Sequence, residues 1–174
     1  MGIHPALAIG PSSRIDIPES KMIIDESSPT NRLGVHGDSY RWPHARDREG
    51  KTVDMRFVLP PQSKTLDMHF ATEFKEGWLA VTDTSAKIGF DLTFPPEVFK
   101  AIWLWLVYGG CRGLYCAAVE AWTGYPGSLA QALKEGAYTS LESGQSLTCE
   151  TCIIGYDDLS QVSRITIDGK VEGS

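Results

Sequence analysis

Apolar and polar residues alternate with a period of two along much of the chain. In residues 66–74 the large apolar side chains occupy even positions, at Leu66, Met68, Phe70 and Phe74, while Asp67, His69 and Glu73 occupy odd ones. Residues 87–94 repeat the pattern. Because successive side chains of a strand point to opposite faces, both segments are predicted to be half-buried antiparallel strands. We expect the polar face with Asp67 and His69 to be solvated, with the lining of a cleft as the alternative.

Further strand-like runs are separated by turn dipeptides such as Glu76-Gly77. The longest apolar run, Ala101–Tyr108, is typical of a buried strand. One helix is predicted over residues 128–135, because Ser128 is a suitable N-cap and Gly136 a suitable stop. The remaining strand-like runs are Arg14–Ile17, Val53–Leu59, Trp78–Thr82, Leu114–Glu120, Tyr138–Glu142, Gln145–Ile154 and Ser163–Ile167. Many short strands and one helix predict an all-β sandwich or barrel-like protein.

Two segments lack this periodicity. Residues 27–50 are polar and interrupted by proline and glycine, which indicates a long loop region around the cluster Tyr40-Arg41-Trp42. The tail, residues 168–174, is expected to fray.

Charge and length narrow the classes of function. The 174 residues include 16 basic and 22 acidic side chains, for a net charge of −6, with no basic block. This balance argues against binding to nucleic acid or to an anionic membrane surface, and a neutral small molecule fits better. No apolar run approaches the ~20 residues of a membrane-spanning helix, and the first residues do not resemble a signal peptide. We therefore expect a cytoplasmic protein.

The cysteine and histidine positions give no cofactor signal. Cys149 and Cys152 are three apart in a strand pattern and would face opposite ways, so we expect all four cysteines to be reduced and packed. His36 and His44 have no partner at metal-ligand spacing, so no metal site is predicted. Gly109–Gly113 precedes a strand rather than a helix, which fits no nucleotide-binding loop. The expected protein is free of cofactors.

Glu120 is the most suggestive single residue. It ends an apolar run and is followed by Trp122-Thr123 and a Gly-Tyr-Pro-Gly turn, so it lies where a strand is expected to leave its sheet. A carboxylate in such a setting is either paired, with turn amides or with Arg112, or functional.

Several segments carry a resemblance to a known family. They are residues 3–18 (IHPALAIGPSSRIDIP), 40–61, 90–110 and 117–154. The last is the most specific: Glu120 precedes Trp122-Thr123, a short helix and then Leu141-Glu142-Ser143-Gly144-Gln145-Ser146-Leu147. In this order the motifs resemble the aldose 1-epimerase (galactose mutarotase-like) family, over about residues 3–154.

The resemblance implies a large antiparallel β supersandwich of the galactose mutarotase type, with the sugar in a cleft on one sheet. Family members are much longer, and the match begins at a His-Pro that lies mid-chain in the family. The resemblance therefore implies a domain truncated at its N-terminal side, lacking an arginine and a histidine that help to hold the sugar. Residues 1–160 would form this single partial domain, followed by a terminal strand and frayed tail in residues 161–174. Sheet edges left open would allow a homodimer.

The activity implied is the interconversion of α and β anomers of a free aldose. A base removes the proton of the C1 hydroxyl while an acid protonates the ring oxygen, so the ring opens and recloses on the other face. By resemblance Glu120 is the base, its pKa raised by apolar neighbours, and His4 of the His-Pro is the acid.

Five residues are candidates for holding the sugar. Trp103 is favoured because an aromatic ring beside the acid and base can serve as a sugar platform. The full set is Trp103, Tyr108, Trp42, His69 and Arg112. The alternative function is a catalytically inactive carbohydrate-binding remnant of the family.

Overall fold

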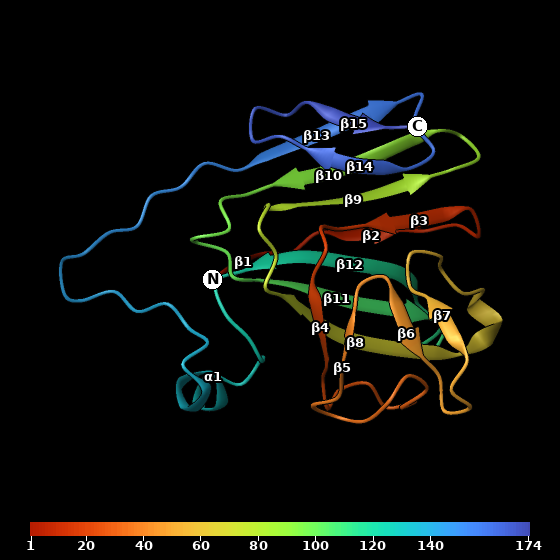
Figure 1. Cartoon of the computed structure of the whole chain (residues 1–174), viewed down its shortest axis with the longest axis horizontal. Helices are drawn as coiled ribbons and strands as arrows, with labels where there is room; N and C mark the ends of the chain where they lie inside the picture. Colours follow the sequence, from red (N-terminus) through yellow and green to blue (C-terminus); the bar gives the residue numbers. More distant parts are fainter.

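The segments with alternating apolar residues form the long central strands of two antiparallel sheets in a computed structural model, which describes all 174 residues (Figure 1). The prediction of an all-β protein is confirmed. The large sheet has nine strands: β1 Gly2–Ile3, β2 Ala6–Ala8, β4 Lys21–Ile24, β5 Ser39–Arg41, β6 His44–Arg46, β7 Thr52–Asp54, β8 Thr65–Thr72, β11 Ala101–Tyr108 and β12 Tyr115–Trp122. The small sheet has four: β3 Ser13–Asp16, β9 Trp78–Asp83, β10 Ile88–Thr93 and β13 Cys152–Asp157.

Strand order in the large sheet is β1-β12-β11-β8-β4-β5-β6-β7, with β2 also paired to β12. The apolar strand β11 lies between β8 and β12, as its continuous hydrophobic run requires. In the small sheet the order is β13-β10-β9-β3. A short 3-10 helix, η1 (Pro61–Ser63), leads into β8.

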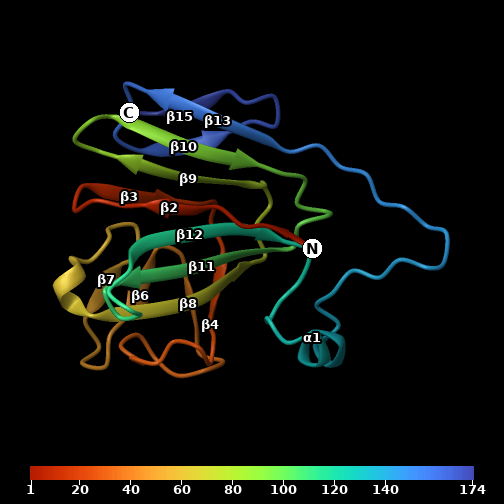
Figure 2. The same ribbon diagram turned by 180° about the vertical axis from the view of Figure 1, so that it is seen from behind.

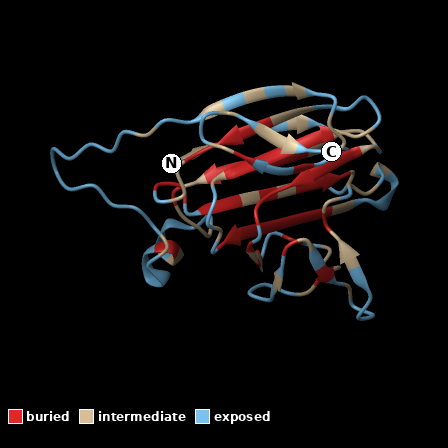
Figure 3. Cartoon of the chain, turned by 45° about the horizontal axis from the view of Figure 1, so that its top comes forward, coloured by how far each residue is buried: buried red, intermediate tan, exposed pale blue.

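The main hydrophobic core lies between the two sheets. Leu104 and Leu106 of β11 and Val119 of β12 project into it from the large sheet, and Leu79 and Leu92 from the small sheet. Their side chains are almost completely buried, and Figure 3 shows the buried residues concentrated on these central strands. Burying such aliphatic side chains contributes roughly 1.5–3 kcal/mol each. The opposite face of the large sheet, which we call its outer face, carries Trp103 and Glu120.

A second, smaller core covers the other face of the small sheet. The C-terminal hairpin, β14 (Val162–Ile165) and β15 (Val171–Gly173), packs Val162 and Ile165 against Trp78 and Ala80 of β9. The residues expected to fray are therefore paired in β15, because Val171 has an apolar surface to cover.

One α-helix, α1 (Leu129–Glu135), follows β12 at the end of the sheets. It begins and ends as predicted: the Ser128 side chain accepts a hydrogen bond from Gln131 N, and Gly136 adopts the left-handed conformation. At seven residues α1 is far too short to cross a membrane, and no other α-helix is present.

The segment after α1 corrects the sequence prediction. Residues 138–151, which we call the arm, were expected to contain strands but run as an extended loop away from both sheets (Figures 1 and 2). All of them except Cys149 are exposed. A strand pattern yields a strand only where a partner strand and a buried face are available, and the arm has neither.

The region predicted as a loop, in contrast, contains strands. Residues 27–50 include β5 and β6, and β4 precedes them between β5 and β8. These strands are three or four residues long, too short for a period to be visible in the sequence.

Asp67 and His69 also differ from expectation. Both side chains point into the sandwich rather than to solvent, with exposed fractions of 1%. Arg32 forms an ion pair with Asp67 at 2.5 Å, and the Tyr40 hydroxyl lies 2.8 Å from His69 Nδ1. Partners from an earlier loop, Arg32, and from β5, Tyr40, satisfy these buried polar groups, which a pattern confined to β8 cannot reveal.

Candidate functional site

His4 and Glu120 meet at one edge of the large sheet although they lie far apart in the sequence. β1 pairs with the end of β12, with Gly2 opposite Trp122 and Ile3 opposite Ala121. This register places His4 Nδ1 2.6 Å from Glu120 Oε1. The histidine side chain is 59% exposed, whereas that of Glu120 is 2% exposed. The structure thus brings together the two residues predicted as acid and base.

Glu120 remains within β12 rather than at its exit, since Ala121 and Trp122 still belong to the strand. Trp122 Nε1 donates a hydrogen bond of 2.6 Å to Glu120 Oε2. Burial raises the pKa of Glu120, and the Trp122 hydrogen bond and nearby His4 partly offset this rise. A carboxylate held this way can exchange a proton closer to neutrality than an exposed glutamate.

Stacked indole rings lie directly beside the carboxylate. The centroids of Trp103 and Trp122 are 4.4 Å apart with an interplanar angle of 20°. Trp103 Nε1 donates to Gly124 O at 3.0 Å, which fixes that ring. Gly2 packs so closely on the other side that a Cβ there would lie 2.3 Å from the Trp122 ring. Only glycine fits at position 2, so Trp122 lies between β1 and Trp103.

The aromatic contacts continue across the outer face. The ring centroid of Phe70 lies 5.0 Å from that of Trp103, in an edge-to-face contact, and 5.8 Å from that of Tyr125. Phe70 is buried, whereas Trp103, Trp122 and Tyr125 are partly exposed. We call these four residues the aromatic band.

The other predicted sugar-binding residues lie elsewhere. Tyr108 and His69 are 1% exposed and face the core between the sheets, and Trp42 packs against the same core at 7% exposure. Arg112 occupies the β11–β12 turn, beyond Tyr115, which is itself about 17 Å from Glu120 along the strand. The structure therefore brings Trp103 alone of this set to Glu120 and His4.

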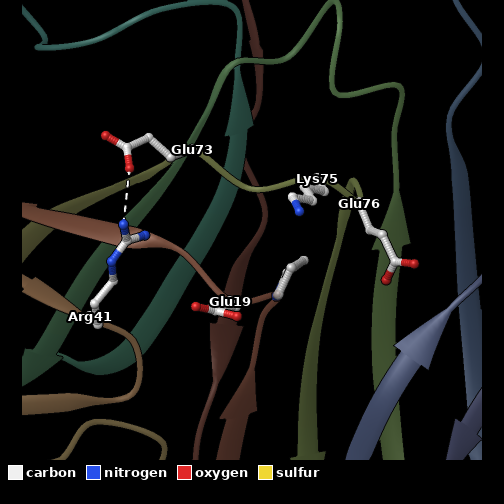
Figure 4. Close-up of a pocket in the computed structure, with 6 residues that line it drawn as sticks. Glu19, Arg41, Glu73, Lys75 and Glu76 are labelled. Atoms are coloured by element: carbon white, nitrogen blue, oxygen red, sulfur yellow. Dashed lines mark ion pairs between the residues drawn. The ribbon is translucent and has the colours of Figure 1, made fainter.

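A charged hollow of about 460 Å³ lies away from Glu120 and His4. Figure 4 shows Glu73 and Arg41 facing one another in it, with their charged atoms 3.4 Å apart. Glu19, Lys75 and Glu76 complete the charged lining. The Arg41 and Glu73 side chains are more than half exposed, so this hollow is a solvated network rather than a built site.

No protein-family model matches the chain, and no curated protein matches it. A solved structure shares its fold. The crystal structure of the Slr1438 protein from Synechocystis sp. PCC 6803 superimposes with a TM-score of 0.51 at 14% sequence identity, over 90% of this chain. The chain spans 43% of that protein's length. The likeness concerns the fold alone.

Sequence analysis named Glu120, His4 and Trp103, which lie together in the structure, but not the residues that surround them. Phe70 was assigned to an apolar face without a function, and Tyr125 to a turn. The signal for Phe70 was present in the alternation of β8, but strand order decides which strands are neighbours. The role of Gly2 has no sequence signal, because it depends on the close approach of β1 to Trp122.

Proposed function

We propose that the chain is an aldose 1-epimerase-like isomerase of the galactose mutarotase type, which interconverts the α and β anomers of a neutral aldose without a cofactor. The observation that carries the proposal is the contact of 2.6 Å between a buried carboxylate, Glu120, and an exposed imidazole, His4, beside a partly exposed indole. Mutarotation needs one base, one acid and a surface for the sugar ring.

In the proposed reaction the sugar enters beside Trp103 and separates His4 from Glu120. The Glu120 carboxylate removes the proton of the C1 hydroxyl, and the His4 imidazolium protonates the ring oxygen as the C1–O5 bond breaks. The C1–C2 bond rotates in the open-chain aldehyde. The C5 hydroxyl then attacks the other face of the aldehyde and closes the ring. In this step Glu120 returns its proton to the oxygen on C1, and His4 takes the proton of the C5 hydroxyl.

The positions of the two side chains suit these roles. Trp122 fixes one oxygen of Glu120 and leaves the other directed to His4. His4 follows a strand of two residues and is largely exposed, so its ring can rotate away to admit a sugar. Without a sugar the two side chains contact one another directly.

The alternative is a carbohydrate-binding remnant without turnover. One observation favours it: His4 and Glu120 touch, leaving no gap between them. In that case the indoles bind the sugar and the ion pair is structural.

Mutarotation of freshly dissolved α-glucose and α-galactose, followed by proton NMR, tests the proposal. We expect catalysis above the buffer rate, reduced by about 10²-fold or more in Glu120→Gln and in His4→Gln, because each removes one proton-transfer group. Glu97→Gln and His44→Gln, at exposed positions, are the matched controls and should retain full activity.

A rate equal to buffer for both sugars, or equal activity in Glu120→Gln, would contradict the isomerase. Saturable chemical-shift changes of the Trp103 indole on adding sugar, without catalysis, would instead support the binding remnant.

A further inference from the structure

The aromatic band leads from Glu120 to a separate hollow across the outer face. Glu120, Trp103, Phe70 and Ile23 are direct cross-strand partners on β12, β11, β8 and β4. Because neighbouring strands are spaced by about 4.8 Å, Ile23 lies roughly 14 Å from Glu120. All four side chains share one face of the sheet.

The hollow at the far end of this row consists of two adjoining parts. They have volumes of about 240 and 310 Å³ and share Ile23, Tyr125 and Glu135 in their linings. Phe70 lines the first part, which joins the hollow to the aromatic band. Taken together, the two parts fall within the roughly 300–1,000 Å³ of small-molecule pockets.

The lining combines an aromatic surface with paired hydrogen-bonding groups. Tyr125 is partly exposed, and Gln131 Nε2 donates to Glu135 Oε1, at the last residue of α1, over 3.0 Å. The remaining oxygens of this amide and carboxylate are free to accept hydrogen bonds from hydroxyl groups. A flat aromatic ring beside such acceptors suits a polyhydroxylated ring.

The charges around the hollow balance. Lys21 and Lys100 line its second part together with Glu73 and Glu135. Lys21 Nζ lies 3.5 Å from Glu73, so these charges are already compensated. This arrangement favours a neutral occupant over a phosphorylated one.

We propose that this hollow is a second sugar subsite and that the substrate is a neutral oligosaccharide whose reducing end lies at Glu120. The inference rests on the proposed function for the role of Glu120. A single pyranose ring at Glu120 is too short to reach a hollow about 14 Å away, whereas an extended chain of two or three sugar units spans the band. The subsite then contributes to binding, and the acid–base pair acts on the terminal ring.

Mutarotation kinetics with glucose, maltotriose and cellotriose test the subsite. We expect at least one trisaccharide to have a KM about tenfold lower than glucose, with similar kcat. Gln131→Ala should raise that KM by about tenfold, the effect of lost hydrogen bonds, and leave glucose kinetics unchanged. Tyr125→Ala should act in the same direction. The matched control is Gln145→Ala in the exposed arm.

Binding to Glu120→Gln protein, measured by calorimetry, separates this inference from the proposed function. Trisaccharide affinity that falls about tenfold on adding Gln131→Ala supports the subsite even if no sugar is turned over. Equal affinity for glucose and both trisaccharides, or equal effects of Gln131→Ala on all three, overturns it, whether or not glucose is isomerised.

Discussion

Asp91 lies in an environment that does not accommodate a charge. Its side chain on β10 is completely buried, and neither carboxylate oxygen has a hydrogen-bond partner. Ala80 and Ile154 flank it on the neighbouring strands, and the C-terminal hairpin covers this face of the sheet. Burial raises the pKa of Asp91 to about 7. The folded protein therefore favours the neutral carboxyl group.

This raised pKa predicts a stability that depends on pH. Between pH 4 and 7 the folded state binds more protons at Asp91 than the unfolded state, so the free energy of unfolding decreases as pH rises through this range. From pH 5 to 8 the wild type should lose roughly 2–4 kcal/mol relative to Asp91→Asn, which cannot ionise. Urea unfolding at both pH values measures the difference.

The control for this experiment is Asp157→Asn, at an exposed position of β13, whose stability should follow the wild type. Parallel curves for Asp91→Asn and wild type from pH 5 to 8 would show that Asp91 keeps its ordinary pKa.

For single residues, the environment was predictable from the sequence where the neighbouring side chains are also close in the chain. Glu120 was identified because Trp122 and the following turn adjoin it in the chain. Asp67 and His69 were expected in solvent, because their partners, Arg32 of a loop and Tyr40 of β5, lie about 30 residues earlier in the chain. Alternation identifies two faces of a strand but does not say which one is buried.

The arm is the element least supported by the rest of the molecule. The backbone hydrogen bond within the arm closes a turn, in which Gln145 N donates to Glu142 O. Residues 138–151 otherwise lack strand pairing, and their side chains are almost all exposed. Exposed segments without backbone hydrogen bonds are the preferred sites of proteolysis.

Limited digestion with a glutamate-specific protease should therefore cut first at Glu142 or Glu150. Mass spectrometry of early time points would identify the fragments. Replacing both residues with glutamine should remove the first cleavage without changing the thermal midpoint, since neither side chain packs on a core. Early cleavage at Glu19 or Glu49 instead would show that the arm is protected.

The elements predicted well from the sequence are those in which the alternation extends over many residues and the strand has a buried partner. β8, β10, β11 and β12 lie close to their expected positions. α1 was predicted from its caps. The arm failed because strand propensity was present without a neighbour, and β4 was missed because four residues show too little of a period.

The whole molecule is a sandwich whose small sheet ends at an unpaired strand. β13 pairs with β10 on one side, and its residue Ile153 is 63% exposed beside the core residue Leu92. Ile88 of β10 is 55% exposed on the same face. An apolar strand edge of this kind is a template for pairing with another chain.

A homodimer through sheet edges stays our prediction for this surface. Sedimentation equilibrium should give a mass above that of the 19.1 kDa chain. Ile153→Lys, which places a charge on the open edge, should shift the equilibrium toward monomer, while Ile167→Lys, exposed outside the strands, should not. A monomer at all concentrations would be the contrary result.

Fold class was predictable from the sequence because it depends on the number and length of strands. Strand order was not, because β1 and β12 are separated by more than a hundred residues. The pairing of these two strands creates the contact between His4 and Glu120, so the site is a property of topology rather than of any local motif.

That dependence makes the site more fragile than the sandwich that carries it. β1 is two residues long, pairs with β12 through Gly2 and Ile3, and is held further only by hydrogen bonds between Met1 and Thr123 and by the partly buried Ile3 at the margin of the main core. Fraying of this short strand on warming would separate His4 from Glu120 while the aliphatic interior stays intact. Under the proposed function, activity would then be lost below the temperature of global melting, and a calorimetric midpoint would not report that loss.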